Sequence, residues 1–508
     1  MRARLPGGAR WWGLAVLSAS LLMVVMDMTI LNVALPELTA DLRPGSTEVL
    51  WIVDAYSLVL AGLLVTASAL GDRWGHRYVL VAGLVVFGVA SVGVLLATSP
   101  GAVIALRALL GVGGAMIMPA TLSLIRHLFP DGRERALALG IWGSMAGVGA
   151  ALGPILGGLM VELFSWHAAF LINVPVVLVA VVAALALLPR GRAASPAPWD
   201  AVALVLSFVG MVALVLAIKE LAKHGVEATG VVAAAVAVVA LGTFGRRTLS
   251  QERPILELRL LGRPQVGAGV LTALATMVGM AAILLVGAQW LQAVEGHSPL
   301  MAGVALLPAA VAGVLASLAA PAIAERIGAR AVLAAGLAAP GLGFLALGLA
   351  SEPSYAVFAV TLTLIGVGMG ALAIGSAVIM AGTPTDRTGS AAAIEETAYE
   401  VGTTLGVAVL GSLAALIYRD ALPVGDLAGS GLSAGDVAAA RDSIGGAEGV
   451  AGTLDPAAAA DLVARAQAAL SDALSGMGVA GSVVLLAAAG VVFALMPRRV
   501  DISGVDAH

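Results

Sequence analysis

Several ionisable residues of this sequence lie inside long apolar stretches, where a charged side chain is costly. They are Asp27, Asp54, Arg107, Glu395, Glu396 and Glu400. An arginine at the centre of a membrane helix costs about 2.5–3.5 kcal/mol on insertion scales, so Arg107 is expected to face a partner inside a helix bundle. Asp27 is the first candidate for that partner. Desolvation favours the neutral form of a carboxyl group and a nearby arginine favours the ionised form, so a carboxyl group between these influences can exchange a proton for a cation.

Each of these residues also has a simpler interpretation. Arg107 lies close to Gly101 and could reach the outer membrane surface. Asp54 could lie at the outer rim of its helix. Glu396 and Glu400 are four residues apart and share a helical face, but acids are also favoured near a helix N-terminus by the helix dipole. Asp27 lies in mid-stretch with no nearby cap or loop, and it is our first choice for a proton-coupling residue.

The composition excludes several other kinds of chemistry. The 508 residues contain no cysteine and six histidines without ligand spacing, so no bound metal is expected. The net charge of −4 comes without a basic cluster, so no nucleic-acid partner is expected either. A Gly-x-x-x-x-Gly-Lys-Ser/Thr phosphate loop is absent, and no set of convergent nucleophiles or acids indicates an enzyme. Charged residues make up 11% of the chain, against about 25% in a soluble domain. The surroundings of this fold must be lipid.

The elements that position the ionisable residues are predicted to be membrane helices. Apolar stretches of about 20 residues number fourteen and lie near 12–35, 49–70, 79–98, 101–124, 136–160, 168–188, 201–218, 228–244, 266–292, 301–321, 331–350, 355–380, 395–418 and 477–496. The first is a retained span rather than a signal peptide, because it continues past Leu22 without a small-residue cleavage site and carries Asp27. The chain is thus predicted to be an all-α polytopic membrane protein.

The distribution of basic residues predicts the orientation, because cytoplasmic loops hold the excess of arginine and lysine. With the N-terminus inside, the outer side carries only Arg43, Lys219, Lys223, Arg419, Arg441 and Arg465. The inner side then carries Arg73, Arg77, Arg126, Arg133, Arg135, Arg190, Arg192, Arg246, Arg247, Arg253, Arg259, Arg263, Arg326, Arg330, Arg498 and Arg499. Both termini are therefore predicted to be cytoplasmic.

One turn of the sequence occurs twice. Asp72-Arg73-x-Gly75-x-Arg77 follows the second span, and the acid-Arg-x-Gly-x-Arg string returns 253 residues later at Glu325 to Arg330, after the tenth span. This equivalence predicts two parallel six-helix halves with two extra helices between them. In the first copy, Gly75 permits a close turn, Asp72 can cap a facing helix N-terminus, and Arg73 and Arg77 can face anionic lipid or carboxylates. The turn is interpreted as a conformational latch, although an ordinary cytoplasmic loop explains it too.

The predicted organisation divides the chain into five parts: an N-terminal six-helix half at 1–190, two inserted helices with linkers at 191–262, five helices of the C-terminal half at 263–418, an extracytoplasmic loop at 419–475, and the last helix with a cytoplasmic tail at 476–508. Small residues crowd the fifth span, where they allow close helix packing and where Pro154 adds a bend. They are Gly143, Gly147, Gly149, Gly153, Gly157 and Gly158.

These motifs resemble those of a known family. The Asp72 turn resembles the major facilitator signature Gly-x-Leu-x-Asp-Arg-x-Gly-Arg-Lys, with Ser68 and His76 in place of a glycine and a basic residue. Gly149-x-x-x-Gly153-Pro154-x-x-Gly157-Gly158 resembles the signature of its drug:proton antiporters. About residues 12–420 resemble the fourteen-span members, especially quaternary-ammonium and multidrug exporters, in the strings 27–36, 51–58, 116–123, 166–175 and 391–397.

The resemblance implies a major facilitator fold and proton-coupled export of lipophilic, cationic drugs by alternating access. It implies that Asp27, Asp54, Glu396 and Glu400 serve protons or cations. Expected partners are a small-molecule drug, protons and membrane lipid, with no cofactor beyond the proton gradient and no obligate protein partner. The expected location is the bacterial cell membrane. Two alternatives stay open: self-resistance to one natural antibiotic, and, less favoured by the fifth-span signature, an uptake symporter.

Two further observations bear on the substrate. The residue 253 positions after Asp27 is Met280, so proton coupling is expected to be asymmetric. Some of the quaternary-ammonium exporters that the chain resembles carry an aspartate in the tenth span, and Met301 to Pro321 contains none, so the resemblance does not extend to specificity for divalent cations. A central cavity would need adaptable methionine and aromatic faces that attract cations. The residues expected there are Met26, Met28, Tyr56, Gln289, Trp290, Gln292 and Tyr399, for each of which ordinary packing is the alternative.

Overall fold

The computed structural model describes residues 7–44, 46–189, 199–224, 226–350, 352–384, 387–422 and 432–497, and the regular structure in these ranges is entirely helical. Among the described residues, fourteen helices are long and apolar enough to cross a membrane. The predicted number of spans is confirmed. Arg190, Arg192, Arg498 and Arg499 lie outside the described residues, as does most of the predicted tail.

Six spans form the N-terminal half. They are α1 (Gly7–Leu42), α2 (Ser46–Trp74), α3 (His76–Val94), α4 (Pro100–Leu128), α5 (Gly132–Leu163) and a broken span made of α6 (Trp166–Leu171) and α7 (Asn173–Leu187). Pro175 explains the break, because proline has no N–H to donate to the carbonyl group four residues earlier and is tolerated in a first helical turn.

Two inserted helices, α8 (Ala201–His224) and α9 (Ala228–Ser250), form an antiparallel hairpin that packs against α2. The Asp200 carboxylate accepts hydrogen bonds from the Arg247 side chain at 2.7 Å and from the Ala203 N–H at 3.0 Å. The bond from Arg247 chiefly lowers the pKa of Asp200 to about 2. One ionised carboxylate thus caps α8 and holds the two inserted helices together.

The C-terminal half follows the short helix η1 (Leu258–Gly262). Its elements are α10 (Pro264–Ala293), α11 (Pro299–Ala305), α12 (Leu307–Ile327), α13 (Ala329–Leu349), α14 (Tyr355–Ala381), α15 (Thr388–Leu405), the π-helical segment η3 (Gly406–Gly411), α16 (Ser412–Ala421), α18 (Ala434–Asp442), α19 (Ile444–Ala451) and α20 (Pro456–Leu495).

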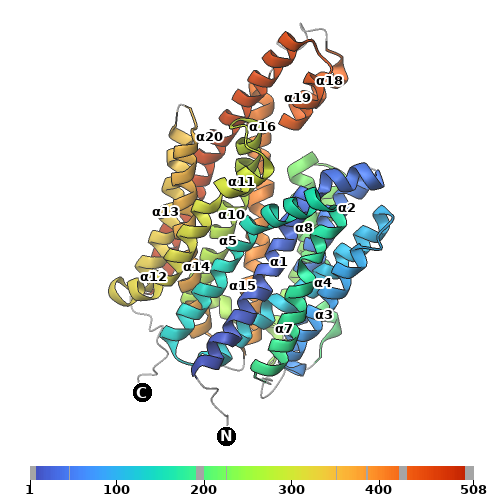
Figure 1. Cartoon of the computed structure of the whole chain (residues 1–508). Coiled ribbons are helices and arrows are strands. Elements are labelled where there is room, and N and C mark those ends of the chain that lie inside the picture. The colour runs from blue at the N-terminus through green and yellow to red at the C-terminus, as the bar shows by residue number, and fades with distance from the viewer. Residues whose placement is uncertain are drawn as a thin grey trace.

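The last span differs from the expectation. A separate span was predicted from residue 477, but α20 is continuous from Pro456, and α18 and α19 project from the same end of the bundle (Figure 1). Asp455 accepts hydrogen bonds from Ala457 and Ala458, and Pro456 occupies the first helical position. This start signal and the alanine-rich sequence after it favour helix. Residues 423–431 of the predicted loop lie outside the described residues.

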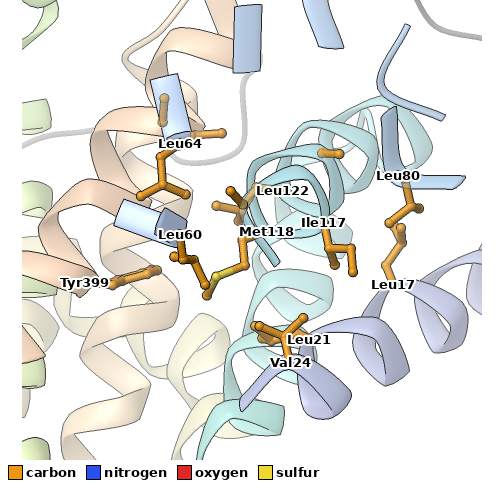
Figure 2. Packing of buried hydrophobic residues seen from close by; sticks show 14 of the residues in the cluster. Leu17, Leu21, Val24, Leu60, Leu64, Leu80, Ile117, Met118, Leu122 and Tyr399 are labelled. Carbon is orange, nitrogen blue, oxygen red and sulfur yellow. The ribbon is translucent and has the colours of Figure 1, made fainter. Parts of the chain in front are cut away.

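The halves meet along α5, which packs against α12 and α14, and along α15, which packs against α2 and α4. Figure 2 shows Tyr399 of α15 beside Leu60 of α2 and Met118 of α4, so a C-terminal helix joins the N-terminal core. The start of α1 and the end of α20 lie at one end of the bundle, here called the terminal side, and α18 and α19 lie at the other, the distal side (Figure 1).

The sequence repeat is present in the backbone. Gly75 and Gly328, 253 residues apart, both precede a helix with positive φ values of 104° and 86°. Residues with a side chain rarely adopt this conformation, so both turns require glycine. The two copies of the motif therefore form the same kind of turn on the terminal side.

Candidate functional site

A buried network surrounds Asp27, which has no exposed surface. Its Oδ2 accepts a hydrogen bond from Arg107 at 2.9 Å, and its Oδ1 accepts one from the Asn173 amide at 2.8 Å. The Asn173 amide also donates to Ser91 Oγ at 3.2 Å. The predicted pairing of Asp27 with Arg107 is confirmed, and both carboxylate oxygens are occupied.

The rest of the Arg107 side chain is also enclosed. Its Nε donates to the Ile52 carbonyl at 3.3 Å, and its guanidinium lies over the Tyr56 ring, 4.7 Å from the ring centre. Arg107 is only 2% exposed, so the interpretation that it reaches the membrane surface is wrong. The Arg107 guanidinium is therefore a buried, paired charge inside the N-terminal half, and the Tyr56 ring is a further partner.

Sequence reasoning did not single out Asn173. It is a polar residue at the junction of α6 and α7, two positions before Pro175, and the break points its amide at Asp27. A polar side chain beside a proline in an apolar stretch could have indicated it, because helix breaks inside membranes need polar partners.

A second group of acids lies on α15. Glu395 and Glu396 have no exposed surface, and Glu400 is buried at 6%. The Tyr399 hydroxyl donates a hydrogen bond to Glu395 Oε1. Within the described part of the chain, neither carboxylate oxygen of Glu396 has a hydrogen-bond partner. An ionised carboxylate without partners in such surroundings is very costly, so Glu396 suits a group that carries a proton.

A cleft of about 560 Å³ opens on the distal side, between α2 and α8 on one flank and η3 with α16 on the other. Its wall is largely apolar and includes Trp51, Leu58, Leu216 and Ala415. The Asp54 carboxylate lies in this cleft and pairs with the ammonium group of Lys219 on α8. Asp54 therefore borders the cleft, with its side chain partly exposed.

On the terminal side the halves are joined by polar contacts. Ser68 Oγ donates to the Gly389 carbonyl at 2.6 Å, and Arg126 donates to the Thr383 carbonyl at 2.6 Å. Glu325 of the second turn pairs with Arg133 of α5 at 3.0 Å. Each copy of the repeated turn thus contacts the fifth span of the opposite half, and this side of the boundary is closed.

Asp72 lies over the first turn of α15, because a Cβ atom at Gly389 would be 2.5 Å from Asp72 Oδ1. This is the expected position for a carboxylate at a facing helix N-terminus, where the dipole favours negative charge. Arg73 is exposed, as expected. The prediction that Arg77 faces anionic lipid or carboxylates is wrong. Arg77 is 8% exposed and donates a hydrogen bond to the Leu188 carbonyl at 3.0 Å, so it binds the end of α7.

The glycines of the fifth-span signature face α1. A Cβ atom at Gly149 would lie 2.8 Å from the Leu22 carbonyl of α1, and one at Gly153 would overlap Thr29. Gly157 faces Ile30 and Gly158 faces Val33, also on α1. The space beside Pro154 is instead occupied by Gly303 of α11, in the other half. These residues set the close approach of α1 and α5.

The residues predicted for a central cavity are dispersed. Met26 packs with Ile30 and Ala169, and Tyr56 donates its hydroxyl to the Val24 carbonyl at 3.3 Å, so both lie inside the N-terminal half. The prediction that Trp290 lines a central cavity is wrong as well. Its ring packs against the Phe358 ring, with the ring centres 5.5 Å apart, inside the C-terminal half. Gln289 is exposed on α10, and Tyr399 is buried at the boundary between the halves.

Comparison with known proteins decides the family. The model of the Major Facilitator Superfamily matches residues 17–407. The chain belongs to the major facilitator superfamily. It is a multi-pass membrane protein of a transporter superfamily, and the resemblance inferred from its motifs is confirmed.

Several relatives of this facilitator are bacterial export or resistance proteins. It is 39% identical to the multidrug efflux pump LfrA of Mycolicibacterium smegmatis, over 95% of each chain. It is 35% identical to the methyl viologen resistance protein SmvA of Salmonella typhimurium, over 96% of this chain and 98% of the relative. It is 32% identical to the tetracenomycin C resistance and export protein of Streptomyces glaucescens, over 96% of this chain and 92% of the relative.

Proposed function

We propose that this facilitator is a proton-coupled exporter of lipophilic organic cations in the bacterial cell membrane, with both termini in the cytoplasm. The terminal side is then cytoplasmic. Because the halves are in contact on that side and the cleft opens on the distal side, we interpret this structure as the outward-facing state. The arginine excess on the terminal side supports the orientation. The efflux and resistance relatives support export.

The observation that carries proton coupling is Glu396 of α15, which is fully buried and has no hydrogen-bond partner among the residues that the structure describes. Its helical neighbour Glu400 lies on the same face one turn further toward the distal side. In our proposal these two carboxyl groups take a proton from the distal side after the drug leaves and release it into the cytoplasm after the transporter reverses. A proton removes the charge that burial penalises, which makes the occluded form accessible.

Asp27 is proposed to couple in a different way. In the outward-facing state its two oxygens accept hydrogen bonds from Arg107 and Asn173, and these bonds favour the ionised form over the protonated one. Movement of these partners, which lie on α4 and α7, would make Asp27 easier to protonate. Coupling through Asp27 therefore belongs to the change of state, while Asp54 is a carboxylate that a cation in the distal cleft can reach.

The range of substrates has two candidate forms. The methyl viologen resistance relative favours organic cations, and the acids of the cleft and α15 support this choice. The tetracenomycin C relative favours the alternative of self-resistance to a natural antibiotic. An uptake symporter is less favoured because the three relatives named above are an efflux pump, a resistance protein, and a resistance and export protein.

Reconstituted liposomes test the proposal. With an acidic lumen, we expect the wild-type protein to accumulate tetraphenylphosphonium in the lumen, and a protonophore to abolish this accumulation. The glutamine side chain of Glu396→Gln stays neutral and cannot carry a proton. Gradient-driven accumulation should therefore fall by at least about tenfold, which corresponds to a free-energy difference of about 1.4 kcal/mol. Exchange of labelled for unlabelled cation should persist, because it needs no proton.

Glu295→Gln is the matched control, because Glu295 is exposed at the distal end of α10. This variant should accumulate the cation normally. Normal accumulation by Glu396→Gln would place coupling elsewhere. Accumulation by the wild type that ignores the pH gradient would reject proton coupling altogether.

A further inference from the structure

The Asp54–Lys219 pair joins the N-terminal half to the inserted hairpin. Asp54 belongs to α2 and Lys219 to α8, and their side chains are 22% and 29% exposed in the distal cleft. A partly exposed ion pair is worth at most about 1 kcal/mol to folding. The pair is therefore weak enough to exchange partners, and each member is open to other ions.

The helix that carries Lys219 also touches the C-terminal half. Met211 and Val215 of α8 pack with Leu58 and Ala61 of α2, and Val401 of α15 packs against the same cluster. Lys219 is close enough to the Glu400 carboxyl group to interact with it electrostatically. The inserted hairpin thus pairs one ammonium group with an acid of α2, on a helix that also packs against α15.

We propose that Lys219 is a specificity-determining residue that acts as a tethered competitor of the organic cation. In the outward-facing state its ammonium group occupies the Asp54 carboxylate, so a cation can stay in the cleft only by displacing it. Intramolecular competition lowers affinity on the releasing side, because the tethered ammonium is always at high local concentration. This inference rests on the proposed function and assigns the inserted hairpin the task of drug release.

The cleft offers the displaced cation an apolar surface. Trp51 is 45% exposed there and can stack against an organic cation, and Leu58 and Leu216 line the same wall. Lys219 has a compact, strongly hydrated ammonium group, so it gains less from these groups than a lipophilic cation does. Lipophilic cations therefore compete with Lys219 through apolar contact as well as charge, while small inorganic cations have only the charge.

Equilibrium binding of tetraphenylphosphonium to the purified full-length protein tests the proposal. Lys219→Met should tighten binding by roughly three- to tenfold, the range expected when one competing partly buried ion pair is lost. Lys219→Arg keeps the charge and should bind as weakly as the wild type. Lys219→Gln should resemble Lys219→Met and serves if the methionine variant is not monodisperse. In the Asp54→Asn background, Lys219→Met should lose most of its effect.

Arg465→Met is the matched control for net charge, because Arg465 is exposed on α20 outside the cleft and pairs with Asp461 at 2.9 Å. Its affinity should stay near the wild-type value. Equal tightening by Arg465→Met and Lys219→Met would mean a general field effect and would overturn the specific role of Lys219. Unchanged or weaker binding by Lys219→Met, with a wild type that binds, would overturn it as well. If neither the wild type nor Lys219→Met binds tetraphenylphosphonium, organic cations are rejected as the substrate. The role of Lys219 as their competitor is then rejected too.

Discussion

At the scale of single residues, the main result is the contrast between two buried acids. Asp27 has both oxygens occupied by Arg107 and Asn173, whereas Glu396 has no partner among the described residues. A fully paired carboxylate stabilises one arrangement of helices, and an unpaired one suits reversible protonation. The same residue type therefore serves two purposes according to its neighbours.

Asp27→Asn is expected to destabilise the protein, because it leaves the Arg107 charge buried without its counter-ion. Breaking a buried pair on one side costs about 3–5 kcal/mol. We expect a lower melting temperature in detergent for Asp27→Asn and partial recovery in the double variant Asp27→Asn with Arg107→Met. A single variant as stable as the wild type would show that Arg107 does not depend on Asp27.

At the scale of elements, the approach of α1 to α5 determines the shape of the N-terminal half. Gly149, Gly153 and Gly157 recur every four residues and form one face of α5 against α1. The contact brings carbonyl groups of α1 within van der Waals distance of α5, which larger residues would prevent. The antiporter-like glycine signature thus has a packing role in this fold, in addition to any role in transport.

Gly153→Ala should separate α1 from α5, because the new Cβ atom would overlap Thr29 and lie 2.8 Å from the Met26 carbonyl. Overpacking of this kind costs about 1–3 kcal/mol. Gly143→Ala is the control, since a Cβ atom there meets nothing within 4 Å. We expect thermal stability and cation export to fall only in Gly153→Ala. Equal losses in both variants would point to glycine flexibility instead of packing.

At the scale of the whole molecule, the boundary between the halves is closed on the terminal side and open at the distal cleft. Asp72 lies at the N-terminus of α15, and Glu325 pairs with Arg133 at the N-terminus of α5. Asp72 and Glu325 are the corresponding acids of the two copies of the repeated turn, and both lie where the halves meet on the terminal side. Both contacts therefore stabilise the same closed arrangement. We therefore propose that they bias the protein toward one state without touching the cleft.

Asp72→Asn should weaken this closure and reduce the population of the outward-facing state. The chain contains no cysteine, so a single Val53→Cys in the cleft can report its accessibility to a maleimide. Labelling should slow in the Asp72→Asn background, while cation affinity stays close to normal. Leu96→Cys, 80% exposed outside the cleft, should label at the same rate in both backgrounds. Unchanged labelling of Val53→Cys together with normal export would argue against a latch.

The sequence alone determined the membrane class, the fourteen spans, the repeated turn and the family, because these depend on apolar runs and short motifs that are local in the chain. The pairing of Asp27 with Arg107 was also predicted, since few charges lie within the membrane. The tertiary structure decided which charges meet. Asn173 reaches Asp27 across 146 positions and Lys219 reaches Asp54 across 165, and only the packing of α7 and α8 brings them together. Met26 and Trp290 turned into the halves for the same reason. The polar residues of α1 and α10 are few and do not mark one face of either helix, so packing alone sets which residues face the interior.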